Sequence, residues 1–195
     1  MAILKILVIS MELKTIATKL VKKIHSSWDK FTEHEHRSDV AGEHRFGDLF
    51  QFLLLIIFMC AGGIDHFFLK TSTILSPYFP IWVRIPFSIL ILWLAWYLAI
   101  GGLRIVFGEI REKSVVVNQG VFSETRHPIY LGGILMYLAA LVLTLSMTAT
   151  IIWVFIILYY GFLAYFEEKL LIEKFGDEYR LYMQQVPMWI PRLRT

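Results

Sequence analysis

Four long apolar blocks constrain the fold of this chain more than any other feature of its sequence. A helix needs about 20 mostly apolar residues to cross the hydrocarbon core of a bilayer, and each block has close to that length. We therefore predict an all-α, polytopic membrane protein with about four transmembrane helices. The predicted spans run from about Leu49 to Leu69, Ile81 to Leu103, Ile129 to Met147 and Thr148 to Phe166.

Composition supports this interpretation and excludes some classes of function. Apolar residues make up 57% of the 195 residues and charged residues only 18%, whereas a soluble domain has about 25% charged residues. The net charge of +3 comes without a stripe of basic and aromatic residues, so we do not expect nucleic acid as a partner. Almost nothing polar separates the last two blocks, which predicts a tight helical hairpin at Leu145 to Thr150.

Lysine and arginine predict the orientation, because they gather on the cytoplasmic side of a membrane protein. Eight lie in residues 1–48, four between Arg104 and Arg126, five between Lys169 and Arg194, and none in the hairpin. Four spans put both ends of the chain on one side, in agreement with the charges. We expect both termini, the loop between the second and third spans, and any site built there to face the cytoplasm.

Residues 1–48 are predicted to form a cytoplasmic segment that precedes a membrane domain at residues 49–195. Apolar residues from Ile6 to Ile24 follow helical spacing and lysines supply a basic face, which predicts an amphipathic helix on a membrane surface. A polar linker follows and holds four of the six histidines. Its "EHEH" stretch has no thiol and no fixed geometry, so we predict no metal site.

Residues 167–195 are predicted to form a cytoplasmic tail helix. Its apolar side is interrupted at Gly176, where a break or cap is expected because glycine destabilises a helix interior. Pro187 and Pro191 end the pattern, and Trp189 between them is interpreted as an interfacial anchor. The start of the chain, Met1 to Ser10, has no clear signal-peptide cleavage site, so we do not expect a cleaved signal peptide, and Met11 is an alternative start.

The stretch "ETRHPIYLGG", Glu124 to Gly133, places two cations directly before a proline at the threshold of an apolar block. Charged groups at the end of a span are costly unless they are wet or paired, which makes them functional candidates. Each part also has an ordinary explanation. Arg126 and His127 can set topology, Pro128 suits the first turn of a helix, and the two glycines permit close helix packing.

Taken together, "RHPIYLGG", the hairpin, and "EEKLLIEKFGDEYRLYMQQVPMWIP" resemble the isoprenylcysteine carboxyl methyltransferase and phospholipid methyltransferase superfamily of integral membrane enzymes. The resemblance covers about Ser114 to Pro191. It implies a methyltransferase that uses S-adenosylmethionine and acts on a lipophilic or lipid-linked acceptor taken from the membrane. The implied cofactor pocket lies between the last two spans, the preceding loop and the tail.

The resemblance also implies which residues contact the cofactor, while Arg126 is expected to anchor the turn. Glu167 matches an acid that can pair with a cationic group, and Phe122 stands where related sequences often have tyrosine. The implied cofactor-binding residues are Ser114, Val115, Val116, Val117, Phe122, His127, Pro128, Ile129, Tyr130 and Glu167.

One departure from the family bears on the acceptor. Enzymes of this superfamily that act on prenylcysteine have an arginine one helical turn before the first acid, where this chain has Leu163. Leucine cannot bind a carboxylate through paired hydrogen bonds, so a carboxylate acceptor is not expected. The acceptor group can then be an amine, a thiol, a hydroxyl or an apolar lipid. Asp65 and His66, near the end of the first span, are candidates for a base on the acceptor side.

Two other classes of protein remain alternatives to a methyltransferase. Membrane sterol and steroid reductases have a similar carboxy-terminal core with an Arg-His-Pro-Asn-Tyr turn and use NADPH, but here Ile129 follows the proline. The second alternative is a non-catalytic membrane scaffold. Binding of S-adenosylmethionine or of NADPH distinguishes the three classes.

Overall fold

The computed structural model describes residues 47–70, 72–108 and 115–190. The chain divides into two compact units, Met1–Ser38 and Asp39–Thr195, and everything described belongs to the second. The predicted amphipathic helix, the histidine-rich linker and Ser114 lie outside the described residues.

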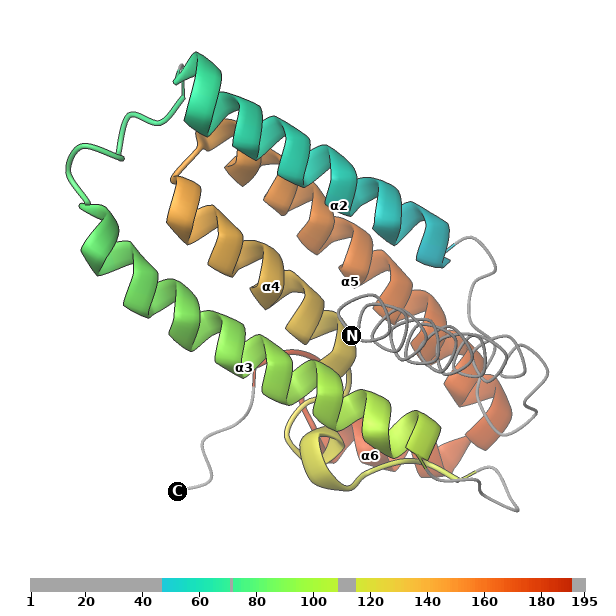
Figure 1. Cartoon of the computed structure of the whole chain (residues 1–195). Helices are drawn as coiled ribbons and strands as arrows, with labels where there is room; N and C mark the ends of the chain where they lie inside the picture. Colours follow the sequence, from blue (N-terminus) through green and yellow to red (C-terminus); the bar gives the residue numbers. More distant parts are fainter. Residues whose placement is uncertain (1–46, 71, 109–114, 191–195) are drawn as a thin grey trace, which may run out of the picture. The chain divides into compact units, whose positions relative to one another are not determined.

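The described part of the chain contains helices joined by turns and loops and no strand, which confirms the predicted all-α class (Figure 1). Four long helices lie roughly side by side, and a short one crosses at one end. They are α2 (Gly47–Ile64), α3 (Ile81–Gly108), α4 (Pro128–Thr144), α5 (Met147–Phe175) and α6 (Asp177–Gln185). α2 continues into a π-helical turn, η2 (Asp65–Leu69), and a 3₁₀ turn, η3 (Gly120–Ser123), precedes α4.

Three segments are long and apolar enough to cross a membrane: Gln51–Leu69, Ile81–Phe107 and Met147–Phe175. In an apolar window of 18 residues in each, at most 22% is buried inside the protein, so most of the apolar side chains there face outward, as expected for helices that contact lipid. α4 is apolar but has only 17 residues, about 26 Å at 1.5 Å per residue. The protein is an integral membrane protein, and the number of four spans stays a prediction.

The predicted hairpin is confirmed. α4 ends where Leu145 adopts a left-handed conformation with φ of 49° and donates its N–H to the Leu141 carbonyl. Ser146 then caps α5 by accepting a hydrogen bond from the Ala149 N–H, a common way to satisfy the free N–H groups of a first helical turn. Because only two residues separate the helices, α4 and α5 run antiparallel.

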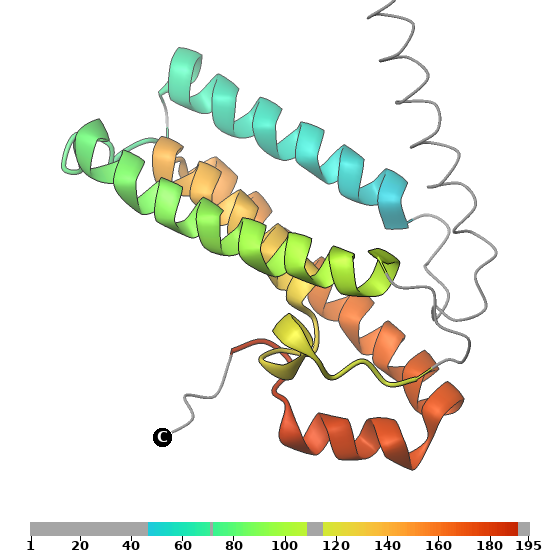
Figure 2. The ribbon, with the colours of Figure 1, turned by 60° about the horizontal axis from the view of Figure 1, so that its bottom comes forward.

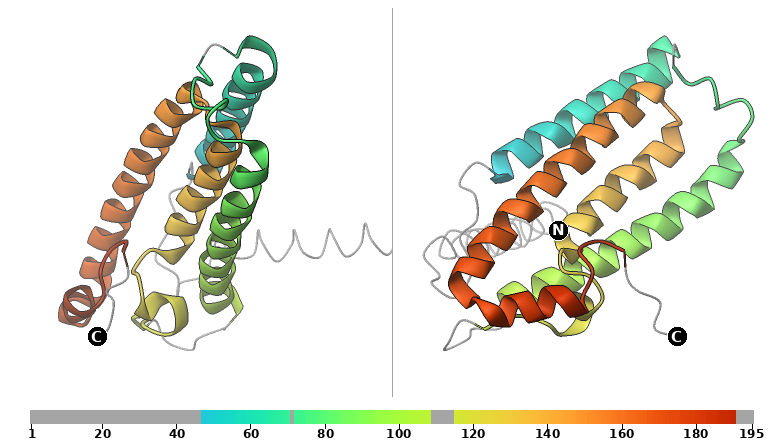
Figure 3. Two further views of the ribbon diagram at one scale, coloured as in Figure 1. Left: turned by 90° about the vertical axis from the view of Figure 1, so that its left-hand side faces the viewer. Right: turned by 180° about the vertical axis from the view of Figure 1, so that it is seen from behind.

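The tail differs from the prediction of a separate helix that starts near Glu167. α5 continues without interruption from the apolar block to Phe175, since residues 167–175 contain no helix breaker. The predicted break at Gly176 is confirmed, with φ of 58°. α6 then turns across this end of the unit, close to η3 (Figures 2 and 3).

Close packing of α3 on α4 depends on small residues. A Cβ added at Gly132 would lie 2.8 Å from the Ala95 carbonyl oxygen and 2.9 Å from the Ala99 Cβ. Ser88 adds a hydrogen bond of 2.8 Å to the Ala139 carbonyl. The predicted role of Gly132 in helix packing is therefore confirmed, as expected where backbones must approach closely inside a membrane.

The turn between α4 and α5 is tied to the end of α2 by buried polar contacts. Asp65 accepts hydrogen bonds from the Ser72 N–H at 3.1 Å and from the hydroxyls of Ser72 and Ser146. His66 Nδ1 lies 3.1 Å from the Thr144 carbonyl oxygen, and Arg84 donates to the Leu143 carbonyl. We call this end of the unit the hairpin end and the opposite end, where α4 begins, the loop end.

Candidate functional site

The candidate site lies at the loop end, where α4 begins. His127 is the N-cap residue of α4, with φ of −123° and ψ of 59°, and Pro128 is the first helical residue. Proline suits that position because its missing N–H would have no partner there. His127 and Pro128 are both buried, so the turn holds a titratable ring inside the protein at the end of an apolar helix.

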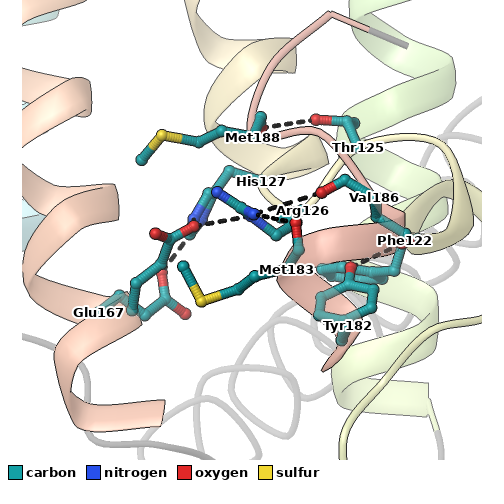
Figure 4. A network of polar contacts seen from close by, with 10 residues as sticks. Phe122, Thr125, Arg126, His127, Glu167, Tyr182, Met183, Val186 and Met188 are labelled. Atoms are coloured by element: carbon teal, nitrogen blue, oxygen red, sulfur yellow. Dashed lines mark hydrogen bonds and ion pairs between the residues drawn. The ribbon is translucent and has the colours of Figure 1, made fainter. Parts of the chain in front are cut away.

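Two consecutive acids of α5 face this ring in different environments. Successive residues of a helix point about 100° apart, and the Glu168 side chain is 8% exposed whereas that of Glu167 is 37% exposed. Glu168 Oε1 lies 3.1 Å from His127 Nε2, and Glu167 Oε2 lies 3.6 Å from His127 Nδ1 (Figure 4). Each ring nitrogen therefore has a carboxylate beside it.

Arg126 connects the acid pair to the tail, as the predicted anchor of the turn. Its Nε lies 2.8 Å from Glu168 Oε1, and its Nη1 donates to the carbonyls of Met183 at 2.9 Å and Val186 at 3.3 Å. Its guanidinium thus pairs with one acid and with the last turn and C-cap of α6. A buried charge is tolerated when it is paired and hydrogen-bonded in this way.

The pKa of His127 is raised above its ordinary value of 6.5 by its two acidic neighbours. Burial alone would lower the pKa, because it disfavours the charged ring. Hydrogen bonds to Glu167 and Glu168 and their negative charges outweigh burial. The protonated ring is therefore favoured near neutral pH, where an imidazolium can donate from both nitrogens.

Aromatic rings extend from His127 along the adjoining helices. The His127 ring stacks on Tyr130, with centroids 5.6 Å apart, and Trp189 lies 5.8 Å away on the tail side. Tyr130 in turn lies 5.5 Å from Tyr160 of α5. Carboxylates beside aromatic faces form an environment that attracts a positively charged ligand.

The loop before α4 and the tail after α6 are clamped together around this site (Figure 4). The Thr125 hydroxyl donates to the Met188 carbonyl at 2.8 Å, and the Arg126 N–H donates to the Pro187 carbonyl at 3.0 Å. The Tyr182 hydroxyl donates to the Phe122 carbonyl at 2.6 Å. Segments about 60 residues apart in sequence thus form one wall beside His127.

The sequence-predicted residues fall into two groups. The structure brings His127, Pro128, Tyr130 and Glu167 together at the start of α4. Phe122 lies where the loop before α4 contacts α6, and its carbonyl accepts a hydrogen bond from the Tyr182 hydroxyl.

The remaining candidates are described by their packing on other parts of the fold. The side chain of Ile129 packs toward α3, because a Cβ added at Gly102 would lie 2.6 Å from its Cγ1. Val116 packs on the buried tail cluster of Tyr179, Tyr182 and Val186. Val117 is half-buried and Val115 is exposed. The cofactor contacts of all these residues stay predictions.

Two residues of the site were not among the expected cofactor contacts. Glu168, rather than Glu167, makes the close contacts with Arg126 and His127. Its only signal was its place beside Glu167. Trp189 was interpreted as an interfacial anchor, but its ring lies 5.8 Å from that of His127.

The prediction of Asp65 and His66 as bases for this site is wrong. Both lie at the hairpin end, where His66 contacts Thr144, the last residue of α4, whereas His127 caps its first turn. The 17 residues of α4 separate the two ends by about 26 Å. Within the described residues, no group of three or more histidine, cysteine or acidic residues could hold a metal ion.

Comparisons with known proteins agree on one superfamily. The phospholipid methyltransferase family matches residues 85–178. Methanethiol S-methyltransferase 1 of Bradyrhizobium diazoefficiens is 43% identical over 79 residues, which are 38% of this chain and 26% of that protein. The matched stretch therefore spans about a quarter of that relative's length.

A solved structure is similar in fold. The eukaryotic intramembrane Ras methyltransferase, isoprenylcysteine carboxyl methyltransferase, superposes with a TM-score of 0.58 at 18% identity, over 76% of this chain and 54% of that chain. At that identity the likeness concerns the arrangement of helices.

Proposed function

We propose that this chain is an integral membrane methyltransferase and that it transfers a methyl group from S-adenosylmethionine to a lipophilic or lipid-linked acceptor. The observation that carries the proposal is the pairing of the buried His127 with Glu167 and Glu168 at the start of α4. These residues fall inside the stretch, 85–178, that matches the phospholipid methyltransferase family.

The residues present suit a ligand with a positive charge. Glu167 keeps 37% of its side chain exposed, so its carboxylate can pair with a cation from outside. Glu168 is already engaged with Arg126 and His127 and is nearly buried. The faces of Tyr130 and Trp189 add an aromatic wall. Glu167, His127, Tyr130 and Trp189 would hold the cofactor.

When bound, S-adenosylmethionine supplies an activated methyl group on a positively charged sulfur. The protein's own contribution is then to orient the reactants and to exclude water. Arg126 fixes the turn. Pro128, Leu163 and Ala164 are each at most 8% exposed and would keep water away from one side of the site. A site at the end of an apolar helix is open to a water-soluble donor on one side and to a lipid-phase acceptor on the other.

The acceptor is proposed to lack a carboxylate. Leu163, one turn before Glu167, is an apolar residue that is 8% exposed. The nearest guanidinium, that of Arg126, already pairs with Glu168 and two carbonyls. A carboxylate placed here would find no free cation, because Arg126 and the protonated His127 are already paired with Glu167 and Glu168. The relative that acts on methanethiol makes a thiol the first acceptor class to test.

The proposed orientation places this site and both termini on the cytoplasmic side. Lysine and arginine support it, because they are absent from the hairpin at Leu145–Thr150 and abundant in the loop and tail. A water-soluble donor made in the cytoplasm would reach the loop end directly.

Titration calorimetry on the purified protein in mild detergent tests the cofactor. Saturable binding of S-adenosylmethionine is expected, weakened by Glu167→Gln and by His127→Ala, while NADPH gives no heat. Lys174→Gln is a matched control on the same helix as Glu167, since Lys174 is not among the residues that contact His127. Binding of NADPH instead would support the reductase class, and binding of neither would support a scaffold.

A further inference from the structure

Tyr160 is a buried tyrosine of α5 that lies on the membrane side of the candidate site. It is 6% exposed and lies seven residues before Glu167, which places it about 10 Å further along the helix toward the hairpin end. Leu163 and Ala164, both buried, separate its level from that of the acids. The polar group of Tyr160 is therefore set apart from the charged cluster by an apolar stretch.

The opposite helix places the Tyr160 hydroxyl at the same depth. A Cβ added at Gly133 would lie 2.9 Å from that oxygen, so the hydroxyl reaches across to α4. Gly133 is six residues beyond His127, about 9 Å along α4. The Tyr160 ring also lies 5.5 Å from Tyr130, whose ring stacks on His127. A continuous aromatic surface thus connects the charged cluster to this hydroxyl.

The Tyr160 hydroxyl makes no hydrogen bond to any residue in the part of the chain that the structure describes. Other buried hydroxyls there are satisfied: Ser88 by Ala139, Thr125 by Met188, and Tyr182 by Phe122. Tyr179 also has no hydrogen bond among the described residues, but it lies in α6, outside the apolar spans. A hydroxyl without a partner in apolar surroundings is unfavourable, and a ligand that forms a hydrogen bond with it would remove this cost.

The Tyr160 oxygen also remains open to a neighbouring molecule. Within residues 47–70, 72–108 and 115–190, the fully buried side-chain nitrogens and oxygens without a hydrogen bond are the Nε atoms of Arg84 and Arg126. Because the Tyr160 oxygen lacks a partner and is not among them, part of its surface is uncovered. Tyr137, 4% exposed and in the same core cluster, supplies a second hydroxyl without a described partner.

The charges nearby restrict what this hydroxyl can bind. The guanidinium of Arg126 is engaged with Glu168 and the tail carbonyls. The Lys169 ammonium lies over the ring of Tyr165, 4.7 Å from its centroid, on an exposed face of α5. Neither cation is available at the level of Tyr160, so an anionic head group would be uncompensated there.

We propose that the Tyr160 hydroxyl binds the head group of the methyl acceptor, and that this head group is uncharged and carries a heteroatom that accepts a hydrogen bond, as a thiol does. The inference rests on the proposed methyl transfer and assigns its acceptor subsite. For a thiol, a sulfur–carbon bond forms to the acceptor, and the donor's carbon–sulfur bond breaks with its electron pair left on the donor sulfur. The thiol proton is released to water.

Thermal unfolding in detergent tests the subsite without relying on turnover, because a ligand that binds the folded state raises the melting temperature. Decanethiol, decane and decanoate are compared on the wild type, on Tyr160→Phe and on Tyr165→Phe. Tyr165→Phe is a matched control, since it removes an exposed hydroxyl from the same helix. Decanethiol is expected to raise the melting temperatures of the wild type and of Tyr165→Phe more than decane does. For Tyr160→Phe, decanethiol and decane are expected to raise the melting temperature equally.

Kinetics provide a second measure. We expect Tyr160→Phe to raise the KM for decanethiol about tenfold, the size of one lost hydrogen bond, while the Kd for S-adenosylmethionine stays unchanged. The proposal is overturned if Tyr160→Phe responds like the wild type, if the wild type does not distinguish decanethiol from decane, or if decanoate stabilises it more. Failure of the wild type to bind S-adenosylmethionine would contradict the proposed function instead, because the melting experiment needs no cofactor.

Discussion

Glu168 Oε1 lies 3.1 Å from Nε2 of His127, across 41 residues of sequence. The same oxygen lies 2.8 Å from Nε of Arg126. One carboxylate therefore ties the first turn of α4 to the last third of α5 and, through Arg126, to the tail. Glu167 contacts the same ring from a more exposed position, and this difference predicts different roles for the two acids.

Glu168→Gln is expected to destabilise the protein, because it leaves Arg126 and His127 without their shared buried acid. Breaking a buried ion pair by removing one partner costs about 3–5 kcal/mol. The melting temperature in detergent should fall well below that of the wild type.

Glu167→Gln is the matched comparison at the adjacent position. Its exposed side chain contributes little to stability, so the melting temperature should change little, while the affinity for S-adenosylmethionine falls about tenfold, or 1.4 kcal/mol. Equal losses of stability for the two variants would contradict this division of roles.

The stability of the protein should fall as the pH rises above about 6.5. His127 has a pKa raised above 6.5 in the folded state, by its hydrogen bonds and charge interactions with Glu167 and Glu168 in spite of burial. A group whose pKa is higher in the folded than in the unfolded state stabilises the fold fully at pH values below its pKa in the unfolded state. This stabilisation is lost as the pH rises through its pKa in the folded state. Melting temperatures of the wild type and His127→Gln between pH 5.5 and 9 measure this. A constant difference between the two proteins across that range would argue against a charged ring.

Substitution of Asp65 should damage the fold without touching the candidate site. Asp65→Ala leaves the hydroxyls of Ser72 and Ser146 without their acceptor, a loss on the order of 2–3 kcal/mol. Because Asp65 lies at the hairpin end, the Kd for S-adenosylmethionine, measured on folded variant below its melting temperature, should equal that of the wild type. A weaker Kd in folded Asp65→Ala would mean that the two ends are coupled.

Two glycines offer a paired test of helix packing. Gly132→Ala introduces a Cβ 2.8 Å from the backbone of α3, which should cost about 1–3 kcal/mol through strain. Gly161 has nothing within 4 Å of its added Cβ, so Gly161→Ala should stabilise α5 by about 0.5–1 kcal/mol. Thermal unfolding of both variants checks the packing of α3 on α4, and a tolerated Gly132→Ala would contradict it.

Local features of the chain were predictable because their physics is local. Length and apolar character predicted the blocks that became α2, α3, α4 and α5. The absence of polar residues around Leu145 predicted the hairpin, and the conformational freedom of Gly176 predicted the end of α5. Pro128 marked the first turn of α4, because its missing N–H would have no partner there.

Features that depend on partners far away in sequence were not predictable in this way. Nothing in the sequence distinguishes Glu168 from Glu167, since only their directions around α5 decide which one meets Arg126. Asp65 is bound by Ser146, 81 residues away, and this contact places it at the hairpin end. Tyr160 follows another tyrosine in an apolar block, and only its approach to Gly133 sets its hydroxyl apart.

Methyl transfer itself is tested most directly in liposomes that contain the purified protein and decanethiol, supplied with S-adenosylmethionine carrying a labelled methyl group. We predict that label appears as methyl decyl sulfide in the lipid phase with the wild type and falls at least tenfold with Glu167→Gln, as its weaker cofactor binding requires. A wild type that binds the cofactor but leaves all label in the aqueous phase, with decanethiol and with extracted membrane lipids alike, would contradict the account.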